Sequence, residues 1–270
     1  MVRPACSTAL TCQGLAVSRG PCVLLRDVSL TVAPGEILHV LGANGCGKST
    51  FLQSIAGLEP FVAGVVTIGG ELPAGLLPAQ LARRRLLLPQ RQIIPFELHV
   101  LDYLGIGWEG CGFDAQRLLG SDGFIHCCHA LDLAPLLDRE IHHLSGGEWQ
   151  RVRLAGVLTL ADQSLNPDVA VVLLDEPFGA LDLGHKAALL GYIRGLADAG
   201  TGFVIVHHEP ALSFAHADRV ALFGEGRLLV CDQPQLALGP EWLARALGVA
   251  SQFAMVGDAR VLVTDLELRR

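Results

Sequence analysis

Short apolar runs, bounded by Gly and Pro, dominate the hydrophobic pattern of this chain of 270 residues. Runs of this length and composition are typical of strands. We expect strands over residues 23–32, 36–41, 65–68, 86–88, 169–174, 203–206 and 220–223. The run over 169–174 has no polar position, as expected of a strand buried on both faces of a sheet.

Helical periodicity follows some of these strands. It covers residues 48–56 and 186–197, and Gly57 is placed to end the first helix as a C-cap. Residues 93–155 differ from the rest, with helical periodicity, Gly breaks and few β-branched runs, and we interpret them as an inserted helical subdomain. Strands that alternate with helices predict an α/β fold with a parallel sheet.

Composition adds constraints on the class of protein. Mean hydropathy is high, at +0.43, but no apolar stretch approaches the roughly 20 residues of a membrane helix, and residues 1–11 lack the apolar segment of a signal peptide. The net charge of −7 argues against nucleic acid as the main partner. The eight cysteines form no C-x-x-C pair. We therefore expect a soluble cytoplasmic protein without a disulfide framework.

A glycine-rich segment carries the clearest chemical signal. Residues 42–49 read GANGCGKS and fit the pattern G-x-x-x-x-G-K-[ST]. In this pattern the glycines let backbone N–H groups point inward at phosphate oxygens, and the start of the next helix favours an anion. We expect Lys48 to reach the β- and γ-phosphates and the Ser49 hydroxyl to ligate Mg²⁺. The alternative is a chance glycine-rich turn, but one of only two lysines in the chain stands here.

Two carboxylates end the apolar run over 169–174. Beside a phosphate-binding loop, Asp175 is placed to hold Mg²⁺ through water, and Glu176 to orient and polarise an attacking water. The alternative is a strand end capped by solvated acids.

Residues 144–148 read LSGGE and resemble the signature sequence of the ABC ATPases. Ser145 and the N–H groups of Gly146 and Gly147 would form a second anion site at a helix N-terminus. In that family this site caps the γ-phosphate held by the opposite subunit. Because the chain has one phosphate loop and one signature, the resemblance implies that a second copy or a homologue completes either site, and a homodimer is the simpler arrangement.

Three further residues match family elements, and the resemblance covers about residues 12–235. Gln90, in LPQ, resembles the Q-loop glutamine that senses Mg²⁺ and water and adjoins a transmembrane partner. Asp182, in ALD, resembles the D-loop, which touches the opposite subunit's site. His208 resembles the switch histidine that contacts the γ-phosphate, although the adjacent His207 leaves the register open.

The resemblance implies a complete set of site residues. The hydrolytic set is Glu176, His208 and Gln90, and the Mg²⁺ set is Ser49, Gln90 and Asp175. The expected nucleotide-binding residues are Gly42, Asn44, Gly45, Cys46, Gly47, Lys48, Ser49, Thr50, Ser145, Gly146, Gly147, Glu148 and Asp182.

The implied fold is an α/β P-loop NTPase of ABC type in a single domain over residues 1–270. A RecA-like core and an antiparallel β subdomain would occupy 1–92 and 156–240, the helical subdomain 93–155, and a short C-terminal extension 241–270.

The implied cofactors are ATP and Mg²⁺. The implied partners are a second ATPase subunit, a polytopic membrane permease and, indirectly, a periplasmic substrate-binding protein, with the chain peripheral on the cytoplasmic face of the cell membrane.

Several stretches narrow the resemblance to the ATPase subunits of vitamin B12 importers. They are residues 36–40 (EILHV), 95–96, 144–154 (LSGGEWQRVRL), the 161–168 insert and the 253–266 tail. Cobalamin is therefore the expected cargo. The alternatives are an iron–siderophore or haem importer, and a soluble ABC ATPase such as an iron–sulfur cluster assembly factor.

Some residues keep two interpretations. Residues 16–20 lack the aromatic that stacks on adenine in many family members, so that Arg19 either stacks there or is solvated. The apolar residues Ile93, Ile94, Pro95, Phe96 and Leu98 line a groove for the membrane partner or pack in the core.

Two clusters of residues are interpreted without a catalytic role. Arg83, Arg84 and Arg85 form a solvated or partner-facing patch, with a weak lipid-headgroup contact as the alternative. The HCCH run over 126–129 packs within the helical subdomain rather than binding a metal, because successive side chains of a helix diverge.

Overall fold

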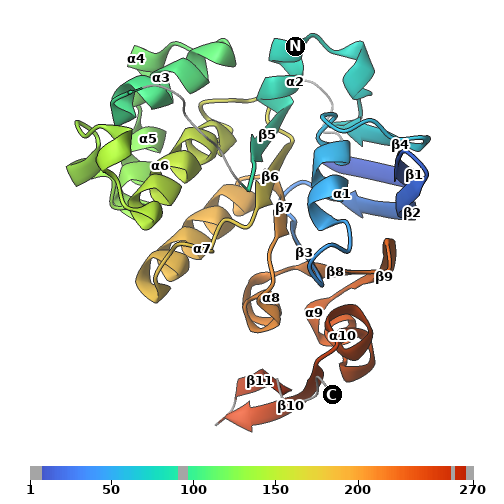
Figure 1. The fold of residues 1–270 in the computed structure, drawn as a ribbon. Coiled ribbons are helices and arrows are strands. Elements are labelled where there is room, and N and C mark those ends of the chain that lie inside the picture. Colours follow the sequence, from blue (N-terminus) through green and yellow to red (C-terminus); the bar gives the residue numbers. More distant parts are fainter. Residues whose placement is uncertain (1–7, 91–96, 257–258, 266–270) are drawn as a thin grey trace.

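A six-stranded sheet forms the centre of the computed structural model, which describes residues 8–90, 97–256 and 259–265 (Figure 1). Across the sheet the strands are β5 (Arg85–Leu88), β6 (Val171–Asp175), β7 (Gly202–Val206), β3 (Ile37–Gly42), β8 (Arg219–Gly224) and β9 (Arg227–Asp232). The first five are parallel, and β9 pairs antiparallel with β8. The expected parallel α/β fold is confirmed.

The middle strands are apolar throughout because both faces of the sheet are covered. In β6, Val171 and Leu173 pack into one core, and Val172 and Leu174 into the core on the other face. Successive side chains of a strand point to opposite faces, so a strand between two cores needs an apolar residue at every position.

A second, antiparallel sheet covers one side of the core, in the order β2 (Cys22–Val32), β1 (Leu10–Arg19), β4 (Ala63–Ile68). It packs with helix α1 (Lys48–Ile55), which follows the phosphate loop. Strand β1 was not among the predicted strands. Its buried residues Cys12 and Leu15 are three positions apart, because the register shifts between them, and the irregularity breaks the alternation that marks a half-buried strand.

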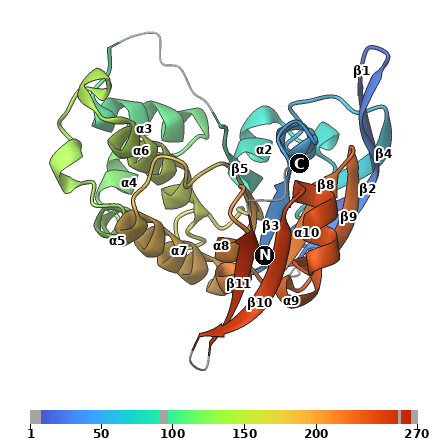
Figure 2. The same cartoon turned by 60° about the horizontal axis from the view of Figure 1, so that its bottom comes forward.

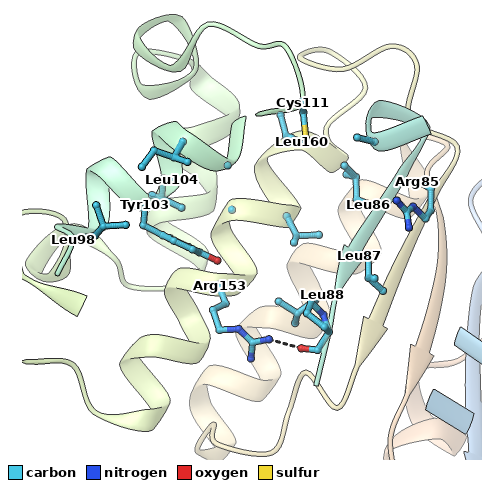
Figure 3. Close-up of a pocket in the computed structure, with 16 residues that line it drawn as sticks. Arg85, Leu86, Leu87, Leu88, Leu98, Tyr103, Leu104, Cys111, Arg153 and Leu160 are labelled. Atoms are coloured by element: carbon cyan, nitrogen blue, oxygen red, sulfur yellow. Dashed lines mark hydrogen bonds between the residues drawn. The ribbon is translucent and has the colours of Figure 1, made fainter. Parts of the chain in front are cut away.

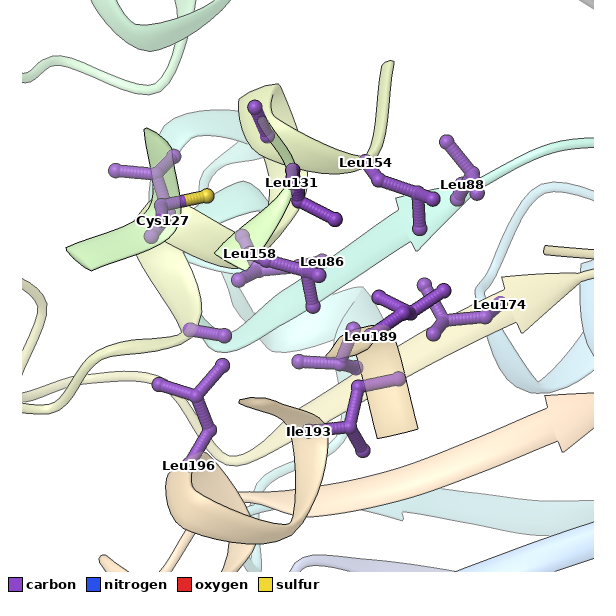
Figure 4. Packing of buried hydrophobic residues seen from close by; sticks show 14 of the residues in the cluster. Leu86, Leu88, Cys127, Leu131, Leu154, Leu158, Leu174, Leu189, Ile193 and Leu196 are labelled. Carbon is purple, nitrogen blue, oxygen red and sulfur yellow. The ribbon is translucent and has the colours of Figure 1, made fainter. Parts of the chain in front are cut away.

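A helical subdomain lies on the other side of the central sheet (Figure 1). Its helices are α3 (Val100–Gly110), α4 (Ala115–Leu119), α5 (Asp122–Ala130) and α6 (Gly146–Leu158). Leu154 and Leu158 of α6 meet Leu86 and Leu88 of β5 in one apolar cluster, which Figure 4 shows together with helix α7 (Leu183–Asp198). Helix α6 continues to Leu158, past residue 155, which we expected to end the subdomain. Its later residues pack directly on the sheet.

The HCCH run of α5 shows the divergence expected of neighbouring helical side chains. Cys127 is fully buried in the cluster of Figure 4, whereas His126 and His129 are exposed. Burial raises the pKa of the Cys127 thiol to about 12, as expected of an inert packing residue.

We expected Arg83, Arg84 and Arg85 to form a solvated patch, but the structure shows all three bonded to other parts of the protein. Arg84 is buried and pairs with Glu71 at 2.8 Å, and Arg85 donates to the carbonyl oxygen of Ala56 at 2.6 Å. Arg83, at the end of helix α2 (Pro78–Arg84), donates to the carbonyls of Cys111 and Gly112. All three guanidinium groups therefore link neighbouring segments of the protein itself.

The C-terminal part packs against the core sheet. It follows helix α8 (Pro210–His216) and contains α9 (Pro234–Ala237), α10 (Pro240–Leu247) and the hairpin of β10 (Ala250–Val256) and β11 (Ala259–Asp265), which comes forward in Figure 2. Leu243 and Leu262 share a buried cluster with Leu41 and Leu222 of the sheet.

Among the described residues, no helix has the length and apolar character needed to cross a membrane.

Two buried histidines lie beneath the edge of the sheet where β3 and β7 end. The His207 Nε2 atom lies 2.9 Å from His39 Nδ1, and the Ser213 hydroxyl lies 3.0 Å from both. The backbone N–H of Glu209 donates to His207 Nδ1 at 3.2 Å, so His207 carries its proton on Nε2. Burial lowers the pKa of His39 to about 3 and lowers the pKa of His207 well below its usual value.

We predict that these histidines make the protein sensitive to acid. Between pH 6.5 and about 3, the unfolded chain binds a proton at His39 that the folded chain does not. The free energy of unfolding should therefore fall as the pH falls through this window, by about 1.4 kcal/mol per pH unit for this residue. His39→Gln should reduce that slope in denaturant titrations between pH 7 and 4.5. His126→Gln, at an exposed position, is the control, and an unchanged slope in His39→Gln would contradict the assignment.

Candidate functional site

The glycine-rich loop connects the end of β3 to the start of α1, as its sequence predicts. Gly47 is the N-cap of α1, with φ 105° and ψ 6°, a left-handed conformation that side chains disfavour. A Cβ atom at this position would lie 2.6 Å from Leu25 Cδ2. Asn44 and Gly45 are exposed at the tip of the loop, and Thr50 is half-buried in the first turn of α1. The helix N-terminus thus carries no side-chain cap and faces the loop.

Lys48 folds back over the loop that precedes it. Its ammonium group donates to the carbonyl oxygens of Gly42 at 2.8 Å and Ala43 at 3.0 Å, and the residue is only 7% exposed. The positive charge is therefore concentrated inside the curl of the loop, where a phosphate would meet it.

Asp175 lies at the end of β6, 4% exposed, and accepts a hydrogen bond from the Ser49 hydroxyl. Its Oδ1 atom is buried and has no hydrogen-bond partner among the described residues. Burial raises the pKa of this carboxyl, and Ser49 and Lys48 oppose the shift. A buried carboxylate with a spare oxygen, beside a hydroxyl, matches the oxygen ligands that Mg²⁺ prefers, so the residues present fit this ion.

Glu176 has an unusual backbone conformation. Its φ is +54°, which costs a non-glycine residue on the order of 1–3 kcal/mol, and its N–H donates to the Val206 carbonyl at 2.9 Å. This turn at the strand end directs the carboxylate toward His208, whose Nδ1 lies 3.0 Å from Glu176 Oε2. Backbone strain that the surrounding fold maintains is frequent at functional positions.

The structure distinguishes the two adjacent histidines. His208 is 62% exposed in its side chain and contacts Glu176, whereas His207 is buried and faces His39. His208 is therefore the residue placed to meet a ligand beside Glu176. The next residue, Glu209, forms an ion pair at 2.7 Å with Lys186 of α7, the second lysine of the chain.

The signature residues form the N-terminus of α6. The Ser145 hydroxyl accepts from the Glu148 N–H at 3.3 Å, and the Glu148 carboxylate accepts from the Ser145 N–H at 2.7 Å, which is a capping box. Arg139 also donates to Glu148, at 2.8 Å. The bond from the Ser145 backbone is the main cause of the lowered pKa of Glu148. Glu148 thus holds the exposed Ser145 in place, which is a capping role beside the expected nucleotide contact.

The segment that carries the D-loop residue contacts the signature helix of the same chain through Ala180. Asp182 caps α7 by accepting from the His185 N–H at 2.8 Å, and its side chain is exposed. Just before it, the Ala180 carbonyl packs so closely on Gly147 that a Cβ atom there would lie 2.8 Å away. Only glycine permits this approach.

One chain does not bring the two anion sites together. Figure 1 shows α1 on one side of strands β5, β6 and β7, and α6 on the other. The loop, Asp175, Glu176 and His208 lie at one edge of the sheet, whereas α6, which starts at the signature, lies across strands β5, β6 and β7 from α1. This separation favours the expected arrangement in which a second copy completes each site.

Two expectations concern residues at the limits of the described structure. Gln90 is exposed just after β5, and among the described residues no hydrogen bond joins it to Ser49 or Asp175. The apolar residues of 93–96 lie outside the described residues, as does the side chain of Arg19.

A largely apolar groove of about 610 Å³ lies beside Gln90, between β5 and the helical subdomain (Figure 3). Leu98, which we expected in such a groove, lines it, together with Leu88, Tyr103, Ile106 and Val157. Arg85 lies at one end of the lining and Arg153 beside Leu88.

Sequence reasoning did not identify Gln150 and Arg153 of α6. Both are buried, and they form hydrogen bonds to Pro177 and Pro89, next to Glu176 and Gln90. Their signal in the sequence is weak: polar residues on a helix that packs against a sheet.

Comparisons with known proteins agree with this geometry. A family model described as ABC transporter matches residues 25–179. The vitamin B12 import ATP-binding protein BtuD of Vibrio cholerae serotype O1 is 35% identical over 226 residues, covering 84% of this chain and 89% of that protein. The hemin import ATP-binding protein HmuV of Bordetella pertussis is 37% identical over 245 residues, covering 89% and 92%. A solved ATP binding subunit of an ABC transporter has the same fold, with a TM-score of 0.75 at 23% identity over 89% of this chain and 97% of that one.

We predict that Glu176→Gln lowers ATP hydrolysis by at least about 10²-fold and leaves ATP binding intact, because the amide cannot accept a proton from the attacking water. Steady-state phosphate release and nucleotide binding would be measured on the same preparation. Glu225→Gln is a matched control, since Glu225 also has a left-handed backbone, with φ 52°, but lies in the turn between β8 and β9. Unchanged turnover in Glu176→Gln would remove this residue from the catalytic role.

We also predict that alkylation of Cys46 blocks nucleotide binding and that bound ATP protects the thiol. Cys46 lies half-buried within the loop, and burial raises the pKa of its thiol, so labelling should be faster at pH 9 than at pH 7. Labelled positions would be mapped by mass spectrometry. Cys46→Ser treated with the same reagent controls for the other thiols, and full ATPase activity after verified Cys46 labelling would refute the prediction.

Proposed function

Because the chain belongs to the ABC transporter family, we propose that it is the ATP-hydrolysing subunit of an importer that takes up vitamin B12 or a related chelate through a separate membrane permease. The observation that carries this proposal is the cluster at one edge of the sheet. There the phosphate loop, Asp175, Glu176 and His208 lie together, while the signature helix α6 lies across strands β5, β6 and β7 from α1, the helix that follows the loop.

The first step is closure of a dimer around two ATP molecules. Lys48 and the N-terminus of α1 bind the phosphates in one copy, and the N-terminus of α6, led by Ser145, binds the γ-phosphate from a second copy. The capping box supports this step, because it holds Ser145 at the helix tip in a fixed orientation.

The second step is in-line attack of water on the γ-phosphate. Glu176 orients that water and accepts its proton, and His208, 3.0 Å from the Glu176 carboxylate, is placed to contact the transferring group. Ser49, Asp175 and Gln90 would hold Mg²⁺, and the ion would neutralise charge that develops on the phosphates. After hydrolysis the phosphate no longer bridges the two copies, and the dimer opens.

The groove beside Gln90 is the proposed docking site for a cytoplasmic helix of the permease. Its apolar lining at Leu98, Ile106 and Val157 suits the apolar face of a helix. Docking there would place this chain on the cytoplasmic face of the membrane, and a periplasmic substrate-binding protein would then contact the permease alone.

The cargo is proposed from the relatives. BtuD is named for vitamin B12 import and HmuV for hemin import, at nearly the same identity to this chain. Vitamin B12 is favoured by the LSGGEWQRVRL segment noted above, and haem is the second candidate. Both are large metal chelates, and neither would touch this subunit.

We predict that Glu176→Gln forms a stable dimer in the presence of ATP and Mg²⁺, because bound nucleotide bridges the two copies and is not consumed. Molar mass would be measured by light scattering after gel filtration, with nucleotide in the buffer. Lys48→Ala, which lacks the phosphate-binding ammonium, should stay monomeric in the same buffer. A Glu176→Gln protein that never dimerises, with or without membrane partner, would refute the proposed arrangement.

The transport function itself is tested by purification from its own membranes. A tagged chain should isolate a polytopic membrane protein, and proteoliposomes of that complex should take up labelled cobalamin faster than labelled haemin. Faster uptake of haemin would select the second candidate. Soluble partners alone would instead favour the assembly-factor alternative.

A further inference from the structure

Three polar side chains of α6 are buried, and two of them, Gln150 and Arg153, are considered first for a part in the function. Gln150 and Arg153 are 7% and 5% exposed, and their spacing of three residues puts them on the same face of the helix. Buried polar groups of this kind are kept only where hydrogen bonds satisfy them, so their partners are informative.

Arg153 connects the docking groove to the segment that leads into Gln90. It lines the groove, and one terminal nitrogen, Nη2, donates to the carbonyl oxygen of Pro89, the bond drawn in Figure 3. The other terminal nitrogen, Nη1, donates to Gln150 Oε1 at 2.8 Å. The planar guanidinium therefore fixes the distance between Pro89 and Gln150.

Gln150 extends the connection to the catalytic strand. Its Nε2 atom donates to the carbonyl oxygen of Pro177 at 3.0 Å. The orientation of the amide is determined by its neighbours, because arginine can only donate and the Pro177 carbonyl can only accept. If the oxygen and nitrogen of the Gln150 amide exchanged places, both hydrogen bonds would be lost.

Pro177 follows Glu176 directly. The N–H of Glu176 is bound to Val206, its φ is left-handed, and the ring of Pro177 fixes the next φ. Rotation about ψ of Pro177 is then the one free torsion between the Glu176 peptide and the Pro177 carbonyl, so a displacement of that carbonyl beyond what this rotation absorbs moves the Glu176 peptide and its carboxylate.

We propose that Arg153 and Gln150 form a relay that transmits occupancy of the docking groove to the position of Glu176. Both are positioning residues, since neither reaches the nucleotide. The groove end of the relay rests on the proposed function, whereas the Gln150–Pro177 end does not depend on a permease. Docking that moves Pro89 would move Arg153, then Gln150, and then the backbone beside Glu176.

The Gln150–Pro177 end is tested in the isolated subunit with Gln150→Glu. The carboxylate still accepts from Arg153 but presents a second acceptor to the Pro177 carbonyl, so this contact is lost. We expect kcat to fall about tenfold and the KM for ATP to stay within about twofold, because the phosphate loop is untouched. Gln116→Glu, at an exposed position of α4, is the matched control. An unchanged kcat in a Gln150→Glu protein of normal thermal stability would overturn this end of the relay, and so would a change confined to KM.

The groove end is tested with Arg153→Lys in the complex with the membrane protein that co-purifies with the chain. An ammonium cannot bridge Pro89 and Gln150 as a guanidinium does. The ratio of the ATPase rate with the membrane protein to the basal rate should fall at least about fivefold. Arg151→Lys is the matched control, because Arg151 is buried on the same helix but donates to Leu131 and Asp132, away from the groove.

The outcomes separate the two proposals. Wild-type stimulation in Arg153→Lys overturns the groove end and leaves the transport function intact. If the membrane protein does not stimulate even the wild type, the transport function and the groove end both fail, while the kcat of Gln150→Glu still decides the Gln150–Pro177 contact.

Discussion

The parallel pairing of β6, β7 and β3 is the constraint on which the site depends. Asp175 pairs with Val206, and Val206 with Val40, so the carboxyl ends of the three strands lie side by side at one edge of the sheet. The phosphate loop follows β3, Asp175 and Glu176 end β6, and His207 and His208 follow β7. Groups separated by more than a hundred residues therefore meet where the charge of a triphosphate can be shared.

Burial beneath that edge increases the attraction of the site for phosphate and metal, and it is accompanied by local strain. Lys48 and Asp175 are almost inaccessible to water, and a low local dielectric increases the attraction of such groups for phosphate and metal. The same burial keeps His39 and His207 neutral beneath this edge of the sheet. The left-handed backbone of Glu176 adds local strain, which the hydrogen bond to Val206 and the packing of two apolar cores maintain.

In the proposed cycle, helix α6 of the helical subdomain would link the signature, the groove and the strand end that carries Glu176. Helix α6 begins at the signature, packs on β5 along the groove, and connects to both Pro89 and Pro177 through two side chains. In the proposed cycle, this one helix would connect the nucleotide of the partner copy, the membrane protein and, through Pro177, the backbone beside Glu176.

The sequence by itself determined the elements whose chemistry is local. The phosphate loop, the apolar strand before Asp175 and the capped start of α6 can each be recognised from consecutive residues, because each is formed by a single short stretch of backbone. Their combination was enough to identify the family, the fold and the expected site. The irregular strand β1 escaped detection, since its register shift disrupts the period of two on which such predictions depend.

Only the tertiary structure decided which residues meet across the chain. It placed His208 rather than His207 beside Glu176, gave Glu148 a capping contact with Ser145, and turned the arginines of 83–85 inward. It also joined Arg153 to Pro89 and Gln150 to Pro177, pairs that are 64 and 27 residues apart. Such contacts depend on how helices and strands pack, and a pattern of neighbouring residues does not encode the packing of distant segments.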